Sequence, residues 1–118
     1  MVKIVYNGCY GGFGLSKTAK QRYAELAGVS VKEEIYEGMM DKIYSSLLDK
    51  NGELLFDSDI ERDDPFLVQV VEEMGKDANG YCADLKIREI PKGSKYIIDE
   101  YDGLETIVLE NEIKWRTA

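Results

Sequence analysis

The chain contains no histidine, and this absence removes several kinds of catalytic site. Without imidazole there is no Ser-His-Asp or Cys-His nucleophile system and no His-ligated metal centre. Cysteine is nearly as scarce, since only Cys9 and Cys82 occur and they lie far apart in the sequence. The first residues run directly into a strand-like segment too short for a secretory leader, so we expect free thiols in a reduced, cytoplasmic setting. No apolar run approaches the roughly 20 residues that span a bilayer.

The chain also has fewer basic residues than acidic ones. Fifteen Lys and Arg residues face 23 Asp and Glu residues, which gives a net charge of −8. Binding to extended nucleic acid needs a basic face that displaces counterions, so this class of partner is disfavoured, as is an anionic membrane surface. A small anion held by backbone N–H groups and one or two arginines remains compatible. The length of 118 residues, with 44% hydrophobic and 32% charged residues, predicts a single globular domain over 1–118.

Glycine, by contrast, is concentrated in one place. The segment 7–16, NGCYGGFGLS, carries four glycines in seven residues, between a short apolar run at 2–6 and a helical pattern. Glycine loses more backbone entropy on folding than other residues, so such a stretch indicates positive φ or close backbone approach. A strand, a glycine turn and a helix N-terminus also present N–H groups to an anion. The structural alternative is a tight strand-to-helix connection, and the segment matches neither the Walker A nor the GxGxxG pattern.

Two helices are indicated by their end signals. Ser16 is a suitable N-cap for a helix over 16–27, which Gly28 would end. Asp64 followed by Pro65 predicts the start of a second helix over 65–74, because an acidic cap and a proline at the first helical position suit a helix N-terminus. Apolar residues at helical spacing over 39–48 favour a third helix.

The alternative for this third segment is a hairpin of 43–48 against 53–56 around Asn51-Gly52. The C-terminal half is predicted to be β-structure, with strands over 81–90, 95–101 and 104–109 and with tyrosines 81, 96 and 101 as half-buried sheet residues. Asp102-Gly103 is a type I′ hairpin signal. The expected fold class is therefore α+β, with about three helices packed on a mostly antiparallel sheet and a C-terminal β-hairpin around Asp102-Gly103.

The candidate ligand site combines the glycine turn with two arginines. In this hypothesis backbone N–H groups hold a phosphate and Tyr10 or Phe13 stacks on a base; the full set is Tyr10, Gly11, Gly12, Phe13, Gly14, Ser16, Arg62 and Arg116. Arg62 lies just before the second helix N-terminus, where a planar guanidinium and helix N–H groups together suit an anion. The structural alternative is a local ion pair of Arg62 with Glu61, Asp63 or Asp64.

The acidic run 57–64 invites a calcium or magnesium hypothesis, but an EF-hand loop starting at Asp57 would need glycine in place of Arg62 and glutamate in place of Val68. We therefore expect neither a metal nor another cofactor, and no catalytic residue.

Several blocks in a fixed order resemble a family of small uncharacterised proteins of bacteriophage genomes and prophages. The blocks are YGGFGLS (10–16), RDDPFLVQVVEEMG (62–75), ANG (78–80), LKIREIP (85–91), EYDGLE (100–105) and RT (116–117). They span most of the chain except 29–56. The C-terminal segment departs from the family, whose members tend to carry an aromatic after the Arg-Thr pair, whereas Trp115 precedes it here.

The resemblance implies no reaction, but it implies a phage-encoded protein acting in the host bacterial cytosol. Small phage proteins without catalytic residues are often inhibitors or binding proteins. The first hypothesis is a binding protein that sequesters a nucleotide-derived immune signal, with pockets built between subunits of a homo-oligomer. The second is an acidic protein–protein inhibitor or adaptor of a host factor, suggested by the net charge and the acidic run. The third is a metal-dependent nucleotide hydrolase that acts through carboxylates.

Overall fold

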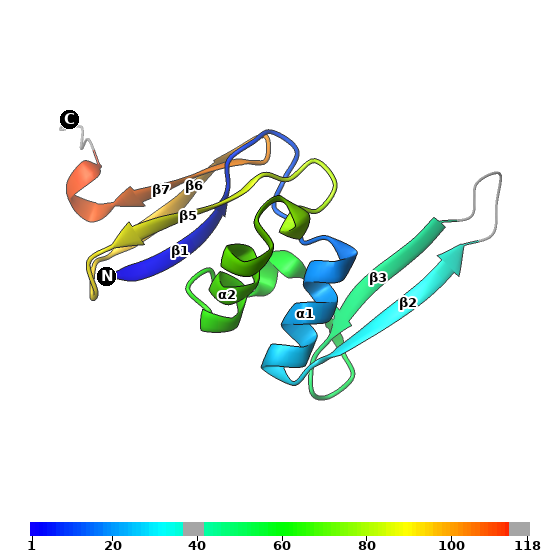
Figure 1. Cartoon of the computed structure of the whole chain (residues 1–118). Coiled ribbons are helices and arrows are strands. Elements are labelled where there is room, and N and C mark those ends of the chain that lie inside the picture. Colours follow the sequence, from blue (N-terminus) through cyan, green and yellow to red (C-terminus); the bar gives the residue numbers. More distant parts are fainter. Residues whose placement is uncertain (37–41, 114–118) are drawn as a thin grey trace.

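The computed structural model describes residues 1–36 and 42–113 and shows a mixed α+β fold (Figure 1). Its regular elements are β1 (Val2–Asn7), α1 (Lys17–Ala27), β2 (Ser30–Tyr36), β3 (Lys42–Leu48), β4 (Leu54–Leu55), α2 (Pro65–Met74), β5 (Leu85–Ile90), β6 (Tyr96–Tyr101) and β7 (Leu104–Leu109). Three short 3-10 helices complete the list: η1 (Asp57–Asp59), η2 (Gly75–Ala78) and η3 (Glu110–Glu112). All pairings between the described strands are antiparallel.

Both helices predicted from their end signals are confirmed. The hydroxyl of Ser16 accepts a hydrogen bond from the Ala19 N–H at 3.1 Å, and Gly28 adopts the left-handed conformation that ends α1. The Asp64 carboxylate accepts from the Phe66 N–H at 2.8 Å, and Pro65 occupies the first turn of α2. Local capping chemistry therefore sets the starts of both helices.

The prediction of a third helix over 39–48 is wrong for residues 42–48, the part of this range that the structure describes. Lys42–Leu48 is strand β3, which pairs with β2 from Ser30↔Leu48 to Tyr36↔Lys42 and with β4 through Leu47↔Leu55 and Leu48↔Leu54. The hairpin alternative around Asn51-Gly52 describes this region better, because the Asp49 carboxylate accepts from the N–H groups of Asn51 and Glu53. Met39 and Met40 lie outside the described residues. We call β2 and β3 together the arm.

The other four strands form two two-stranded sheets. β1 pairs with β5 from Val2↔Ile90 to Asn7↔Leu85, and β6 pairs with β7 from Tyr96↔Leu109 to Tyr101↔Leu104, with Asp102 and Gly103 between them. Side chains of both sheets share a small core centred on Ile4, Ile90 and Ile107. Arg88 of β5 joins the two sheets, because its guanidinium donates to the Ile107 carbonyl and, at 2.8 Å, to the Glu112 carboxylate.

The larger core lies between the helices, β1, β5 and the base of the arm. Its buried apolar residues are Val5, Leu15, Ala19, Tyr23, Ala24, Leu47, Ile60, Leu67, Val68, Val70, Val71, Ala78 and Leu85. From this core the arm projects sideways (Figure 1). The molecule measures 55 × 31 × 27 Å with a radius of gyration of 16.0 Å, whereas a compact chain of this length has a radius near ~13 Å. The arm accounts for this elongation.

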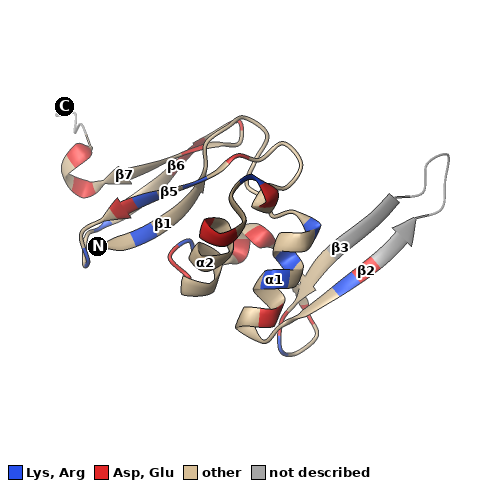
Figure 2. Ribbon diagram, viewed as in Figure 1, with Lys and Arg blue, Asp and Glu red and all other residues tan. Residues whose placement is uncertain are grey.

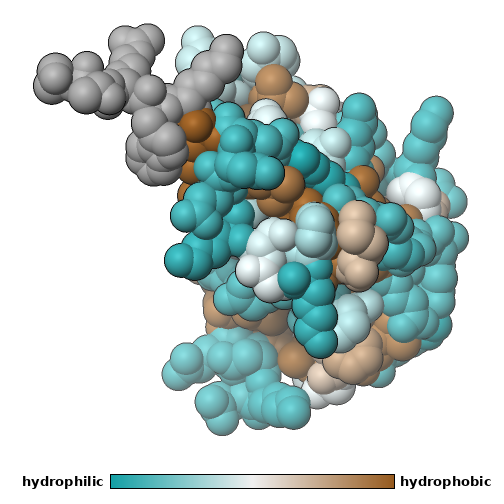
Figure 3. Space-filling model, turned by 90° about the vertical axis from the view of Figure 1, so that its left-hand side faces the viewer, coloured by the Kyte–Doolittle hydropathy of each residue, from teal (hydrophilic) through white to brown (hydrophobic). Residues whose placement is uncertain are grey.

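Charged residues are dispersed over the surface. Acidic residues occur on both helices, on the strands and on η3, with basic residues scattered among them (Figure 2). On the face shown in Figure 3, hydrophilic side chains predominate and hydrophobic ones show between them. Among the described residues, no helix is long and apolar enough to cross a bilayer.

Candidate functional site

Three loops meet at one end of the two sheets. They are the glycine turn after β1, the segment 80–84 before β5, and the turn between β6 and β7. The Gly8 N–H donates to the Asp84 carbonyl at 2.7 Å, and the Gly11 N–H donates to the Asp102 carbonyl at 3.2 Å. The Cys9 thiol donates to the Cys82 carbonyl at 3.0 Å. The glycine turn is therefore bonded to both of the other loops.

Asn7, the last residue of β1, is the buried centre of this junction. Its side-chain amide donates to the carbonyls of Cys9 at 2.8 Å and Gly103 at 2.7 Å. Its side-chain oxygen accepts from the Asp84 N–H at 2.8 Å, and its own backbone N–H donates to the Glu105 carboxylate at 2.8 Å. Because Asn7 is fully buried, its own polar groups are shielded from water, and leaving any of them without a partner would be costly. One side chain thus fixes three loops.

Glycine is needed here for close backbone approach. A Cβ on Gly103 would lie 2.3 Å from the Gly12 nitrogen, and one on Gly11 would lie 2.6 Å from Cys82 Cβ. Gly103 also has φ +89° and Gly11 φ +128°, a region that other residues rarely adopt. Gly80 packs against the Gly14 backbone in the same way, with its N–H donating to the Gly14 carbonyl at 2.9 Å. The glycine content is thus explained by loop-to-loop packing, the structural alternative of the sequence analysis.

Three of the six backbone N–H groups from Gly11 to Ser16, which were predicted to hold a phosphate, are bonded within the protein. The Gly11 N–H is bonded to Asp102, the Leu15 N–H donates to the Asp57 carboxylate at 3.0 Å, and the Ser16 N–H donates to the Ala78 carbonyl at 2.9 Å. The Ser16 hydroxyl caps α1 and donates to the Asp77 carbonyl at 2.5 Å. These groups are not available to a phosphate without breaking native bonds.

Arg62 does reach the glycine turn, but it is paired there. Its guanidinium is buried, lies 3.6 Å from the centre of the Phe13 ring, and binds both oxygens of the buried Glu105 carboxylate at 2.6 and 3.0 Å. This is the bidentate geometry that makes arginine–carboxylate pairs strong. The local ion pair expected with Glu61, Asp63 or Asp64 is replaced by a partner 43 residues away. The geometry does not support an anion clamp that is open to solvent at this position.

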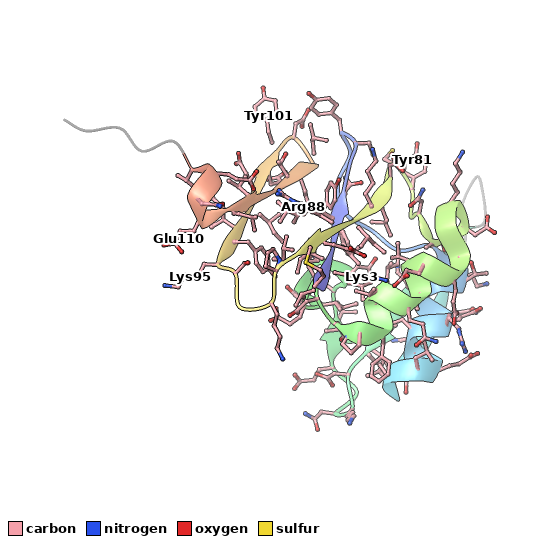
Figure 4. The ribbon with its side chains drawn as sticks, turned by 60° about the vertical axis from the view of Figure 1, so that its left-hand side comes forward. Lys3, Tyr81, Arg88, Lys95, Tyr101 and Glu110 are labelled. Carbon is pink, nitrogen blue, oxygen red and sulfur yellow. The ribbon has the colours of Figure 1, made fainter. Side chains whose placement is uncertain are left out.

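Above this buried network the three loops present three tyrosines to solvent. Tyr10 is 62% exposed, Tyr81 98% and Tyr101 75%. Figure 4 shows Tyr81 and Tyr101 at the same end of the sheets, with their rings directed outward. We call this surface the tyrosine end, defined by Tyr10, Tyr81 and Tyr101. The expectation that Tyr81 and Tyr101 are half-buried sheet residues is wrong, whereas Tyr96 is half-buried.

A sequence signal for two of these tyrosines was present. Tyr81 directly follows the Asn79-Gly80 turn pair, and Tyr101 directly precedes Asp102-Gly103. Residues beside a turn project from the end of a sheet, and there an aromatic ring has fewer neighbours to cover it. The charge around the tyrosine end is mostly acidic, from Asp84, Glu100 and Asp102. Lys86 of β5 also lies nearby, with its ammonium 4.0 Å from the Asp84 carboxylate.

Phe13 also lines a small pocket. Its volume is about 290 Å³, and it is lined by Phe13, Lys20, Ser46, Leu47, Leu54, Leu55, Phe56, Asp57 and Ser58. Phe56 is 59% exposed and Leu54 52% exposed at its rim. The Lys20 ammonium lies 3.8 Å from the Asp57 carboxylate. The pocket therefore offers aromatic and aliphatic surface beside one ion pair, at the lower end of the size range of ligand sites.

The remaining predicted site residues do not join these features. Arg116 lies outside the described residues. In the acidic run, Asp57 accepts the Leu15 N–H and Asp64 caps α2, so both carboxylates have structural roles. Among the described residues no group of three or more Cys, Asp or Glu side chains is placed to hold a metal ion.

Comparison with known proteins found no matching family model, no matching curated protein and no matching solved structure.

Proposed function

We propose that this chain is a non-catalytic binding protein that recognises a protein partner through the tyrosine end. The observation that carries the proposal is the exposure of Tyr10, Tyr81 and Tyr101 on three loops fixed by buried hydrogen bonds. Tyrosine is enriched in protein interfaces because it supplies a large, rigid contact area with a polar tip. A rigid base under the rings lowers the entropy lost on binding.

Charge favours a protein partner over a nucleotide at this surface. The tyrosine rings could stack on a base, but a phosphate would meet Asp84, Glu100 and Asp102 around them. The nearby arginine, Arg62, is bound to Glu105. A partner with basic residues around an apolar patch fits both the rings and the acidic rim. The resemblance to phage proteins is consistent with a host factor as this partner, and with inhibition as the outcome.

The test is affinity capture from a host bacterial extract with the wild-type chain and two variants. We expect a Tyr10→Ala, Tyr81→Ala, Tyr101→Ala triple variant to lose the partner, because each central interface tyrosine contributes on the order of 1–2 kcal/mol. Phe56→Ala removes an aromatic of similar exposure outside the tyrosine end and serves as the matched control. Capture that weakens steeply with salt would support the acidic rim. Equal capture by the triple variant would overturn the proposal.

A second candidate function is sequestration of a small nucleotide-type ligand, with the pocket beside Phe13 as its site. The specific observation in its favour is that two phenylalanines and a lysine line the same pocket. A base could contact Phe56 while a phosphate competes with the Asp57 carboxylate for the Lys20 ammonium. This candidate keeps the immune-signal hypothesis but moves the ligand away from the glycine turn.

Thermal unfolding with a panel of ADP-ribose derivatives and cyclic di- and trinucleotides tests this candidate. A ligand that binds only the folded state raises the melting temperature. We expect the shift to disappear in Phe56→Ala and Lys20→Ala and to persist in the tyrosine triple variant. The absence of a shift for every compound in wild-type protein argues against nucleotide capture, whatever the extract experiment shows.

A further inference from the structure

Strand β6 is an open edge of its sheet. β6 pairs with β7, and no other strand in the described part of the chain pairs with it. The Lys95 carbonyl accepts from the Glu110 N–H, and hydrogen-bonded positions alternate along an antiparallel pair. The N–H and C=O groups of Tyr96, Ile98 and Glu100 therefore point away from β7. No hydrogen bond from another described residue reaches them, so this edge offers donors and acceptors to a further strand.

The side chains of this segment alternate between the core and solvent. Tyr96 and Ile98 pack on the small core, whereas Ile97 is 53% exposed. Lys95 and Asp99 are exposed on the same face as Ile97, one on each side of it, because successive side chains of a strand point to opposite faces. Figure 4 shows the Lys95 side chain directed away from the sheets. Within the described residues neither charge takes part in a salt bridge, so each is available to an opposite charge on another molecule.

This row of side chains is complementary to itself in the antiparallel direction. The free backbone groups of two copies can bond only when they face one another, and this places the two-fold axis at a residue rather than between two residues. With the axis at Ile97, Lys95 of each copy lies opposite Asp99 of the other, and Ile97 lies opposite Ile97. Tyr96 lies opposite Ile98, and these two positions exchange backbone hydrogen bonds on both sides of the axis. Opposite charges and β-branched residues directly across strands both stabilise pairing.

The neighbouring registers lack this match. With the axis at Ile98, each Ile97 lies opposite Asp99, so the carboxylate loses its cation and faces an aliphatic side chain. With the axis at Tyr96, Lys95 lies opposite Ile97 and the ion pairs are again lost. Charged side chains on an edge usually act against pairing. Here they favour one register of this strand with a second copy of itself.

We propose that β6 is a homodimerisation edge, along which two copies of this chain join their β6–β7 hairpins into a four-stranded antiparallel sheet. Ile97 lines a mostly apolar hollow of about 220 Å³ together with Ile113, and the Ile97 of the second copy brings a further aliphatic side chain to this surface. Each hairpin also gains the neighbouring strand that a two-stranded sheet lacks. The inference does not rest on the tyrosine end, whose Tyr10 and Tyr81 lie on other loops.

The experiment is size-exclusion chromatography with light scattering, at protein concentrations from about 5 to 500 µM. Salt at about 0.15 M screens the general repulsion between two chains of charge −8. We expect wild-type protein to approach twice the chain mass of 13.4 kDa at the upper concentrations. Asp99→Lys places two lysines opposite each other on both sides of the axis and should raise the dimer dissociation constant at least about tenfold. The double variant Lys95→Asp, Asp99→Lys restores opposite charges and should restore the dimer.

Asp77→Lys is the matched control, because it makes the same change of charge at an exposed residue of η2, outside both sheets. It should dimerise like wild type. Amide hydrogen exchange then tests strand pairing directly. The N–H groups of Tyr96 and Ile98 should exchange more slowly as the concentration rises, whereas the Ile97 N–H, which faces β7, should be protected at every concentration.

Circular dichroism and melting temperatures check that all variants fold. A wild-type monomer at every concentration would overturn the proposal, as would a dimer in which the Tyr96 and Ile98 amides exchange as fast as in the monomer. Equal weakening by Asp99→Lys and Asp77→Lys would also overturn it. Failure of the charge swap to restore the dimer in a folded protein has the same meaning.

Discussion

At the scale of single residues, the most constrained interaction is the buried pair of Arg62 with Glu105. Each charge is costly to bury, and the pair is tolerated because both terminal nitrogens of the guanidinium meet carboxylate oxygens. Phe13 covers the guanidinium, and the Glu105 carboxylate also accepts the Asn7 N–H. The sequence singles out Arg62 as unusual because arginine is scarce. The sequence does not identify the partner of Arg62, because several acidic residues lie next to Arg62 in the chain whereas Glu105 lies 43 residues further on.

Removing the Glu105 carboxylate leaves Arg62 buried and unpaired. We predict that Glu105→Ala lowers the free energy of unfolding by about 3–5 kcal/mol. Glu105→Gln should cost less, because the amide oxygen still accepts from Asn7. Adding Arg62→Met to Glu105→Gln should recover part of the loss. Urea unfolding of the three variants measures these differences, and a cost below about 1 kcal/mol for Glu105→Ala would contradict the predicted role of the pair.

Tyr23 gives a prediction with a pH dependence. Its hydroxyl donates to the Asp64 carboxylate at 2.9 Å, and burial, followed by this bond and the Asp64 charge, raises the pKa of the phenol above its usual value. A raised folded-state pKa means that the stabilisation is complete below the unfolded value near 10 and is lost as pH rises above it. Tyr23→Phe should lower the free energy of unfolding by about 1 kcal/mol at neutral pH. Above pH ~10 the free energy of unfolding of this variant should fall less steeply with pH than that of the wild type. Chemical unfolding measured across alkaline pH checks this, with parallel pH profiles as the contrary result.

At the scale of elements, a helix or strand could be predicted where the residues that determine it lie close together in the chain. The starts of α1 and α2 were predicted because the cap residues lie next to the helices they begin. The strands on either side of Asp102-Gly103 were expected at 95–101 and 104–109, close to the observed β6 and β7. The segment 42–48 was mispredicted because its apolar spacing fits a helix as well as a strand. Pairing with β2 and β4 decides it, and that information is not local.

The turn between β6 and β7 gives an element-scale prediction with an internal control. Gly103 and Gly93 have similar positive φ values, +89° and +85°, but a Cβ at 103 would collide with the glycine turn whereas one at 93 meets open space. Gly93→Ala should cost roughly 1 kcal/mol of backbone strain. Gly103→Ala should cost at least about 2 kcal/mol more, because the loops must separate. Thermal unfolding of both variants measures the difference, and equal losses would show that the close approach is unimportant.

At the scale of the whole molecule, the structure divides into a packed body and an arm. The body contains both cores and the tyrosine end, whereas the distal half of the arm extends past them (Figure 1). The pattern of helix and strand signals predicted the α+β class, but nothing in the sequence predicted the elongation. The sequence also placed Tyr10, Tyr81 and Tyr101 in three separate segments and gave no way to bring them together, because their proximity depends on Asn7 and on the register of two sheets.

We predict that the distal arm contributes little to the stability of the body. Replacing residues 34–44 by Asn-Gly keeps the Glu33↔Ser45 pair and closes a shorter hairpin. The free energy of unfolding should change by less than about 1 kcal/mol, because the replacement keeps Val31 and Leu47, which pack in the larger core. Urea unfolding at low protein concentration tests this, with gel filtration to confirm a smaller hydrodynamic radius. A loss of several kcal/mol would mean that the distal arm belongs to the body.

The buried amide of Asn7 also has a consequence for biosynthesis. Asn7 leaves the ribosome well before Gly103, whose carbonyl it binds 96 residues later in the chain. The nascent chain can form α1, the arm and α2 early, but the end bearing Tyr10, Tyr81 and Tyr101 cannot close until the last hairpin has emerged. A product that terminates before β7 would retain both helices without a fixed recognition surface. The surface that bears the three tyrosines would therefore be completed only after β7 has been synthesised.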